Sequence, residues 1–361
     1  MPKKHLKIAL ILNAVLLFTT STFAQEEAPV THRAEVCSFI EEMVAKHDFD
    51  KEDLQQLFQQ AVVREDIIQS MDKPSEAKPW FDYQKLFVTE KRTQQGVEFW
   101  QQHENTLARA EREYGVPASI VVAILGVETN YGEIQGNHRV IDALFTLSFE
   151  YPRRADFFKN ELEEFLLLSR ENKFEPDSVL GSYAGAIGQA QFMPSSYRNY
   201  AIDFTDSGNI DLRNEVSDAI GSIANYLKTH GWKAGQPIVT PIETNDEFEA
   251  PNQKQLKPTL ALGQLKQQGI QPQQKLPDDT LATFITLDGE DNHEHWLGFQ
   301  NFYTITRYNT SELYAMAVYQ LAEEISEIRL TDIESTPHSI EESSDLPLIK
   351  ENDTVQQQPL I

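Results

Sequence analysis

Apolar residues recur at helical spacing through most of the first 235 positions of the chain. After Asp50, a typical helix-starting residue, apolar side chains return every three or four positions as Leu54, Leu57, Phe58 and Ala61. Three further segments have the same spacing: VEFWQQHENTLARAEREYG, ELEEFLLLSR and SDAIGSIANYLKTHG. The first and third of them stop at a glycine, which commonly ends a helix. Residues 25–235 are therefore expected to be mostly helical.

The pattern changes after this helical part. Residues 236–296 are rich in β-branched residues interrupted by proline and glutamine, which predicts a small β-rich insertion. Helical spacing returns in YAMAVYQLAEEI, within residues 297–329. Residues 330–361 carry many acids and little apolar periodicity, which predicts a disordered acidic tail. The expected fold class is α+β and predominantly α, with an N-terminal helical region over residues 25–110 and a core over residues 111–235. Residues 297–329 are expected to form the C-terminal part of that core.

The first 24 residues have the composition of an export signal. Three lysines open the chain, an apolar stretch runs from Ile8 to Phe18, and small residues lead to a cleavage site after Ala24. The apolar stretch is short for a membrane span, so an uncleaved anchor is the weaker alternative. Because no cysteine lies near the cut, a lipid-anchored form is not expected.

Charge and cysteine content exclude some classes of protein. The formal net charge is −25, and removal of the signal leaves 28 basic and 56 acidic residues. Such an excess of acids disfavours nucleic acid as a partner. Cys37 is the only cysteine, so the exported chain has no internal disulfide. We expect Cys37 to be buried and inert, with a reactive thiol as the alternative.

A single acid ends the most apolar run of the chain. The segment VPASIVVAILGVE places Pro117 near a helix start and Glu128 near the helix's C-terminal end. Burial and the negative end of the helix dipole both disfavour the ionised carboxylate, which would raise its pKa and suit it to donate a proton. The alternative is a structural glutamate that is bonded to a backbone donor or lies beyond the last buried turn.

The segment GSYAGAIGQAQFMPSSY, residues 181–197, is dense in small and amide side chains. Gly185 and Gly188 allow a ligand to approach the backbone, while Ser182, Gln189 and Gln191 offer hydrogen bonds. These properties suit a groove for a neutral polar polymer such as a glycan. The alternative is an ordinary loop of small residues that leads into a helix.

Five separated motifs, in this order, resemble the lytic murein transglycosylase B family of bacterial enzymes that cut peptidoglycan. They are GVETNYG, ALFTLSFEYPRRADFF, SYAGAIGQAQFMPSSYRNYAIDF, DAIGSIANYLKTHGW and NFYTITRYN, and the resemblance extends from Trp80 to Ile325. It implies a lysozyme-like catalytic core. With the export signal, it also implies a soluble, periplasmic protein.

The resemblance carries functional roles to particular residues. Glu128 matches the single catalytic acid and base of the family, and Ser182 matches the serine that contacts the N-acetylmuramoyl residue. Further matches to positions that line the substrate groove are Gln191, Tyr226, Tyr308, Asn309, Tyr314 and, with the shortest flanking motif, Tyr83. Arg153 and Arg154 either steer the anionic peptide stems or form structural ion pairs.

The implied reaction explains why one carboxylate suffices. Glycosidases that use water usually need two carboxylates. In a lytic transglycosylase, Glu128 would protonate the bond between N-acetylmuramic acid and N-acetylglucosamine, and the sugar's own C6 hydroxyl would close a 1,6-anhydro ring. The alternatives are a muramidase that uses water and a catalytically inactive glycan-binding scaffold.

A loop over residues 203–218 resembles the start of an EF-hand, a metal loop that some family members carry. Its candidate ligands are Asp203, Thr205, Ser207, Asn209 and Asp218. An EF-hand normally has acids at its third and fifth positions and a glutamate at the twelfth, so this loop is expected to bind Ca²⁺ only weakly. No cofactor is expected to be required. The expected partners are peptidoglycan glycan strands and cell-wall synthesis or division machinery, with the protein itself a monomer.

Overall fold

The computed structural model describes residues 33–73, 77–243 and 255–335, and the chain divides between Ala61 and Val62 into two compact units. The first unit contains α1 (Ala34–His47) and α2 (Lys51–Gln59). The side chain of Asp50 accepts hydrogen bonds from the backbone N–H groups of Glu52 and Asp53, so the predicted helix start is confirmed.

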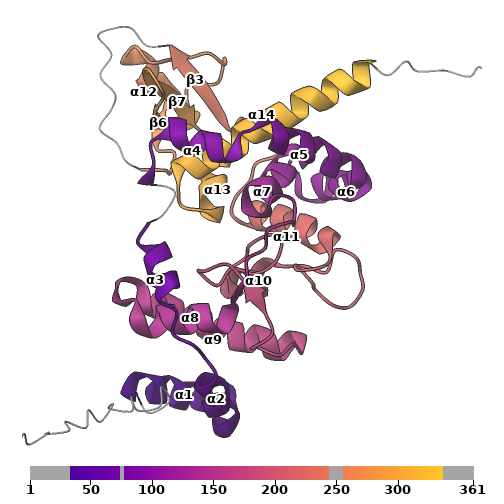
Figure 1. Cartoon of the computed structure of the whole chain (residues 1–361). Helices are drawn as coiled ribbons and strands as arrows, with labels where there is room; N and C mark the ends of the chain where they lie inside the picture. Colours follow the sequence, from indigo (N-terminus) through magenta and orange to yellow (C-terminus); the bar gives the residue numbers. More distant parts are fainter. Residues whose placement is uncertain (1–32, 74–76, 244–254, 336–361) are drawn as a thin grey trace, which may run out of the picture. The chain divides into compact units, whose positions relative to one another are not determined.

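The second unit is built mainly of helices (Figure 1). Before the β-rich part these are α3 (Glu65–Met71), α4 (Trp80–Phe87), α5 (Glu90–Gln102), α6 (Glu104–Tyr114), α7 (Ala118–Thr129), α8 (Val140–Glu150), η3 (Pro152–Arg154), α9 (Ala155–Asn172), α10 (Pro194–Tyr200) and α11 (Val216–Thr229). Strands β1 (His138–Arg139) and β2 (Leu180–Gly181) pair with each other. The last described elements are α13 (Gln300–Tyr308) and α14 (Glu312–Ser335). The predominantly helical fold class is confirmed.

The centre of this unit is α7, which is buried on all sides. Every residue from Ala118 to Val127 is buried, because the helix is apolar around its whole circumference and packs against α5, α6, α11 and α14. It ends at Asn130, whose left-handed backbone lets its N–H bond to the Gly126 carbonyl while the Tyr131 N–H bonds to Leu125. Glu128, one position before the last residue of α7, is thereby fixed at the end of the core helix.

The β-rich insertion is a five-stranded antiparallel sheet in the order β4-β6-β7-β3-β5. Its elements are β3 (Val239–Glu243), β4 (Leu260–Ala261), α12 (Leu262–Gln267), β5 (Gln271–Pro272), β6 (Leu281–Asp288) and β7 (His293–Gly298). Leu262, Leu265, Phe284 and Leu297 form its own small core. Strand β6 lies inside the segment 236–296 that was expected to be rich in β structure, and β7 extends two residues beyond the predicted end of that segment at residue 296.

The expected division near residue 110 does not separate two compact units. Helix α5 lies before that position and α6 runs across it, yet both pack directly on α7, and α5 also packs on α14 (Figure 1). They bury apolar side chains such as Val97 and Leu107. The long helical segment predicted here is interrupted at His103, which separates α5 from α6.

Two further expectations are wrong. Cys37 is exposed, because the buried stripe of α1 is formed by Val36, Phe39, Ile40 and Met43, and position 37 lies off that stripe. The acidic tail was expected to lack structure from residue 330, but α14 continues to Ser335.

The last described turns of α14 are tied to the helices beside it. Arg329 donates to Glu104 at 2.7 Å and lies 4.9 Å from the ring centre of Trp100. Residues 336–361 and the proposed signal at residues 1–24 lie outside the described residues. In the described part of the chain, no helix combines the length and the apolar character needed to cross a bilayer.

Candidate functional site

The carboxyl group of Glu128 is held by a tyrosine from a distant part of the chain. Glu128 is half-buried, and its Oε1 accepts a hydrogen bond of 2.6 Å from the hydroxyl of Tyr314. Tyr314 lies near the start of α14 and is only 2% exposed. Because α14 packs along α7, two residues 186 positions apart meet at this point.

A group of aromatic side chains surrounds this contact. Tyr308 stacks on Tyr314 with their ring planes 8° apart and their centroids separated by 6.4 Å. The centroid of Tyr226 lies 5.0 Å from that of Tyr308, and Phe192 lies within 5.7 Å of both. Their hydroxyls are anchored to the backbone, since Tyr308 donates to the Ala190 carbonyl and Tyr226 to the Arg307 carbonyl, each at 2.5 Å.

These tyrosines are neutral hydrogen-bond donors. Burial, followed by the negative charge of Glu128, raises the pKa of both Tyr308 and Tyr314 well above the ordinary value. Burial raises the pKa of Tyr226 to about 12. A phenol that keeps its proton can stabilise a carboxylate without neutralising it.

Tyr83 lies behind this group. It is 1% exposed on α4, within ring-contact distance of Trp80 and Phe87. It is close enough to Tyr314 to help raise that residue's pKa, after the larger effects of burial and Glu128. The predicted groove residue Tyr83 is thus buried in α4, near Tyr314.

The loop that contains Ser182 is held in place by backbone contacts that require glycine. The Ser182 Oγ accepts hydrogen bonds from the N–H groups of Ala186 at 3.0 Å and Ala184 at 3.3 Å. Gly136 has φ +95°, and a Cβ there would lie 2.0 Å from the Gly181 carbonyl oxygen. Only glycine at position 136 therefore lets the segment after Glu128 lie against the Ser182 loop.

The two predicted segments also meet through hydrogen bonds that the sequence did not reveal. Thr129, the neighbour of Glu128, donates from its hydroxyl to the Gln189 carbonyl at 3.0 Å and accepts from the Gly132 N–H. Gln191 has φ +48°, and its amide nitrogen donates to the carbonyls of Gln135 and Gly188 at 3.1 and 2.8 Å. Neither Thr129 nor Gln135 has a spacing that would have marked it in advance.

Among the remaining site predictions, Asn309 directly follows α13. Its carbonyl accepts a hydrogen bond of 2.7 Å from the Ser311 N–H. Glu133, the acid five positions after Glu128, is exposed and accepts a hydrogen bond from Asn130 at 2.5 Å.

The EF-hand-like loop satisfies its own carboxylates. Asp203 accepts hydrogen bonds from the backbone N–H groups of Thr205, Ser207 and Gly208, the last at 2.6 Å. Although partial burial opposes it, the pKa of Asp203 is lowered by these donors. Asp218 accepts from Phe204 and Asp211 at 2.8 and 2.9 Å, and burial raises its pKa. No cluster of three metal-binding acids, histidines or cysteines occurs among the described residues.

The fold and site together define a helical protein with one acid at the end of a buried helix, facing neutral phenols. The chain belongs to the family described as "Transglycosylase SLT domain", whose model matches residues 31–323. A curated relative, the membrane-bound lytic murein transglycosylase B of Escherichia coli K12, is 44% identical over 303 residues, covering 81% of this chain and 82% of the relative. The expected family resemblance is confirmed.

Two solved structures illustrate the likeness. The lytic transglycosylase Slt35 of Escherichia coli in complex with calcium is 43% identical with a TM-score of 0.76, and the match covers 83% of this chain and 95% of that one. SltB3 of Pseudomonas aeruginosa in complex with NAG-NAM-pentapeptide is 30% identical with a TM-score of 0.70, covering 80% of this chain and 78% of that one. The lysozyme-like type of fold expected from the sequence is confirmed by such structures.

Proposed function

We propose that this protein is a peptidoglycan lytic transglycosylase. It cuts the β-1,4 bond between N-acetylmuramic acid and N-acetylglucosamine and leaves 1,6-anhydro ends. The observation that carries the proposal is the contact between Glu128 and Tyr314, in which a half-buried acid is oriented by a neutral donor. Family membership supports the same reaction class.

In the proposed reaction, Glu128 acts first as an acid and then as a base. Its carboxyl proton passes to the glycosidic oxygen, and the bond from that oxygen to the anomeric carbon breaks while the N-acetyl group assists at that carbon. The carboxylate then removes the proton of the C6 hydroxyl, whose oxygen bonds to the anomeric carbon. Glu128 regains its proton, and no water is consumed.

The surrounding residues divide into two roles in this proposal. Ser182, Gln191 and Asn309 contact the sugar and its N-acetyl group, and Tyr226 and Tyr308 form the aromatic wall. Since both N–H groups of the Gln191 amide are used within the protein, its carbonyl oxygen is the atom that would accept from a sugar hydroxyl. The Tyr314 hydroxyl is bonded to Glu128, so Tyr314 positions that carboxyl group, and Tyr83, which is 1% exposed, lies in the core near Tyr314.

Weak calcium binding at the loop of residues 203–218 is part of the proposal. A relative's structure was solved with calcium. In this chain, Asp203, Thr205, Ser207, Asn209 and Asp218 supply only two carboxylates, and both are bonded to backbone N–H groups that an ion would have to displace. Isothermal titration should give a Kd weaker than micromolar. A micromolar Kd would contradict the proposed weak affinity. The absence of any heat of binding would show that the loop does not bind calcium.

We further propose that the protein acts outside the cytoplasm as a monomer. An export signal at residues 1–24, cleavage to a soluble periplasmic form and association with cell-wall synthesis or division machinery complete this picture. Analytical ultracentrifugation tests the monomer, and N-terminal sequencing of the mature protein tests the cleavage after Ala24.

Digestion of purified peptidoglycan, followed by mass spectrometry, tests the function. Products with anhydro ends are lighter by one water than products with reducing ends, which a muramidase would release, and an inactive scaffold would release nothing. Glu128→Gln should abolish product release while glycan affinity and unfolding temperature stay unchanged. The matched control is Glu133→Gln, which neutralises an exposed acid five positions away and should leave turnover unchanged. Full activity of Glu128→Gln would show that Glu128 is not the catalytic acid and base.

A further inference from the structure

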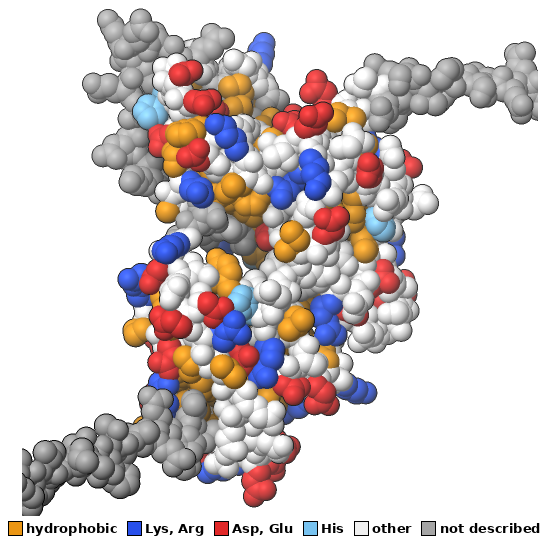
Figure 2. Space-filling model, viewed as in Figure 1, with side chains coloured by type: hydrophobic (Ala, Val, Ile, Leu, Met, Phe, Trp, Pro, Cys, Tyr) orange, Lys and Arg blue, Asp and Glu red, His pale blue; other side chains and the backbone are white. Residues whose placement is uncertain are grey.

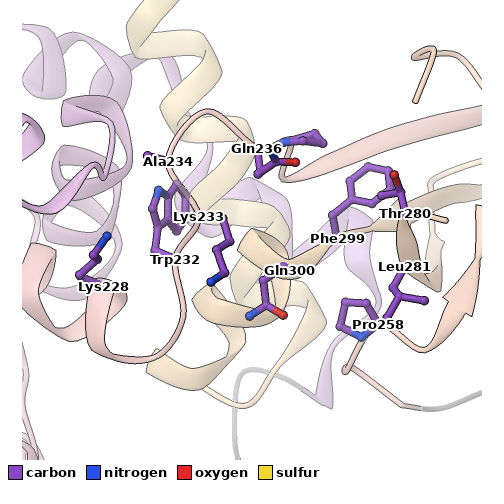
Figure 3. A pocket seen from close by; sticks show the side chains of 11 residues that line it. Lys228, Trp232, Lys233, Ala234, Gln236, Pro258, Thr280, Leu281, Phe299 and Gln300 are labelled. Atoms are coloured by element: carbon purple, nitrogen blue, oxygen red, sulfur yellow. The ribbon is translucent and has the colours of Figure 1, made fainter. Parts of the chain in front are cut away.

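A pocket of about 520 Å³ lies where the helical part meets the β-rich insertion. Figure 3 shows Lys228, Trp232 and Lys233 on one side, Pro258 and Leu281 on the other, and Gln300 between the two sides. The first side comes from the end of α11 and the loop after it, and the second from β6 and the residue segment before β4.

The charge of this pocket is opposite to that of the protein. Its eleven described lining residues include two lysines and no acid, although the chain has 56 acids and 31 basic residues. On the face drawn in Figure 2, acidic and basic side chains are interspersed. Lys228 and Lys233 are exposed, and neither forms an ion pair with any acid of the described ranges 33–73, 77–243 and 255–335. Two ammonium groups without an ion-pair partner among the described residues favour an anionic ligand.

Arg153 and Arg154, for which the sequence left open a role in steering anionic peptide stems, both make contacts within the protein. Arg153 forms an ion pair of 2.9 Å with Asp72. The guanidinium of Arg154 lies 4.3 Å from the ring centre of Phe157 and 5.2 Å from that of Phe158. Because Arg153 and Arg154 both make contacts within the protein, a structural role is better supported for them than the steering of anionic peptide stems.

The wall that carries Lys233 is preformed. Asn301 is fully buried, and its side chain accepts from the Lys233 N–H at 2.8 Å while donating to the carbonyls of Lys233 and Gln236 at 2.9 and 2.8 Å. Trp232 is 3% exposed and donates from its indole nitrogen to the Gly115 carbonyl at 2.9 Å. Because this wall is already ordered before a ligand binds, little free energy is lost in ordering it on binding.

The polar and apolar groups around the lysines suit a peptide. Gln236 presents an amide that can pair with peptide groups. The Gln300 amide nitrogen donates to the Gly231 carbonyl at 3.4 Å and the Thr304 hydroxyl at 3.3 Å, so its carbonyl oxygen is the atom that can accept from a peptide N–H. Leu281, which is 50% exposed, offers apolar contact for small side chains. Together with the two ammonium groups, this lining matches a short peptide that carries free carboxylates.

The pocket lies within reach of the proposed catalytic groove. Gln300 begins α13, and Tyr308 of the aromatic wall ends it, so the two are separated by about 12 Å along the helix. A peptide of five residues can span about 17 Å when extended. A peptide attached to a sugar beside Tyr308 is therefore long enough to enter the pocket.

We propose that the pocket lined by Lys228, Lys233, Gln236 and Gln300 binds the carboxylates of the peptide stem that peptidoglycan carries on its muramic acid. This inference rests on the proposed function for the identity of the polymer. It adds a second binding site, at the opposite end of α13 from the aromatic wall, and makes stem-bearing glycan a better substrate than bare glycan.

The test is titration of the full chain with the free pentapeptide stem, released from its sugar by an amidase. We expect saturable binding that weakens as salt is added. Lys228→Gln combined with Lys233→Gln should weaken it by about tenfold, as expected for two exposed ion pairs, whereas arginine at both positions should keep it within about threefold. Lys275→Gln removes an exposed charge elsewhere on the insertion and is the matched control for unchanged binding.

Several outcomes would overturn the inference. They are no binding by the wild-type chain, equal binding by the double glutamine variant, and equal binding of a stem whose carboxylates are amidated. Binding that appears only after truncation at Ser335 would assign the pocket to the chain's own acidic C-terminal residues instead. Because the probe contains no sugar and no bond is cut, a failure here is distinct from a failure of the proposed cleavage reaction.

Discussion

Replacing Tyr314 by phenylalanine removes one hydrogen bond and little else. The phenol donates to Glu128 Oε1 at 2.6 Å, while its ring is 2% exposed and stacked on Tyr308. Phenylalanine keeps that packing and deletes only the donor. In the proposed reaction the bond strengthens as Glu128 loses its proton, so it stabilises the transition state more than the resting acid.

The size of the effect follows from the charge on the acceptor. A hydrogen bond to a charged group contributes roughly 1.5–3 kcal/mol. If half of the carboxylate charge has developed in the transition state, the loss is roughly 0.8–1.5 kcal/mol, or about a 4- to 13-fold fall in kcat. Loss of the donor destabilises the ionised carboxylate of Glu128 more than it destabilises the neutral acid. In the variant, the protonated form of Glu128 should therefore persist to a pH that is higher by about one unit.

The assay is the release of soluble muropeptides from purified peptidoglycan, measured as a pH profile. Tyr314→Phe should lower the plateau and move the alkaline limb to higher pH. The control is Tyr319→Phe, because Tyr319 lies on the same helix and its hydroxyl pairs with Glu323, an acid outside the site. A lower plateau with an unmoved alkaline limb would indicate a purely structural role and refute the reasoning.

Two other predictions concern the loops. Gly136→Ala should destabilise the fold by roughly 3 kcal/mol or more in urea unfolding, since left-handed strain adds to the clash with the Gly181 carbonyl, whereas Gly269→Ala, with equal strain but open space, should cost about 1 kcal/mol. Equal costs would contradict this. Because the pKa of Asp203 is lowered from 3.8, its contribution to loop order should be complete above that pH and be lost as the pH falls further. Exchange of the Gly208 amide measures this, and loosening near neutral pH would contradict it.

The position of Glu128 could be predicted from the sequence because its causes are local. The apolar run that follows Pro117 is too long for a typical strand and has no polar face, so it predicts a buried helix that ends near Asn130. The exposure of Cys37 was also recoverable. The helical stripe of Val36, Ile40 and Met43 leaves position 37 outside, and our expectation gave more weight to the general behaviour of cysteine.

The partners of Glu128 could not be predicted in this way. Tyr314 is 186 positions away, and Tyr308 reaches a carbonyl 118 positions away, so neither contact leaves a periodic signal. Only the family resemblance pointed to these tyrosines, and it did not distinguish the buried Tyr83 from residues that line a groove. The continuation of α14 beyond residue 330 was not predicted for a similar reason. Arg329 pairs with Glu104, which lies on another helix and far away in the sequence.

Cleavage of peptidoglycan in ¹⁸O-labelled water tests the central claim, that the sugar's own hydroxyl replaces water as the attacking group. The account predicts fragments that carry no heavy oxygen and end in the 1,6-anhydro form. Fragments whose new reducing ends contain ¹⁸O would contradict it, because water would then have attacked the anomeric carbon.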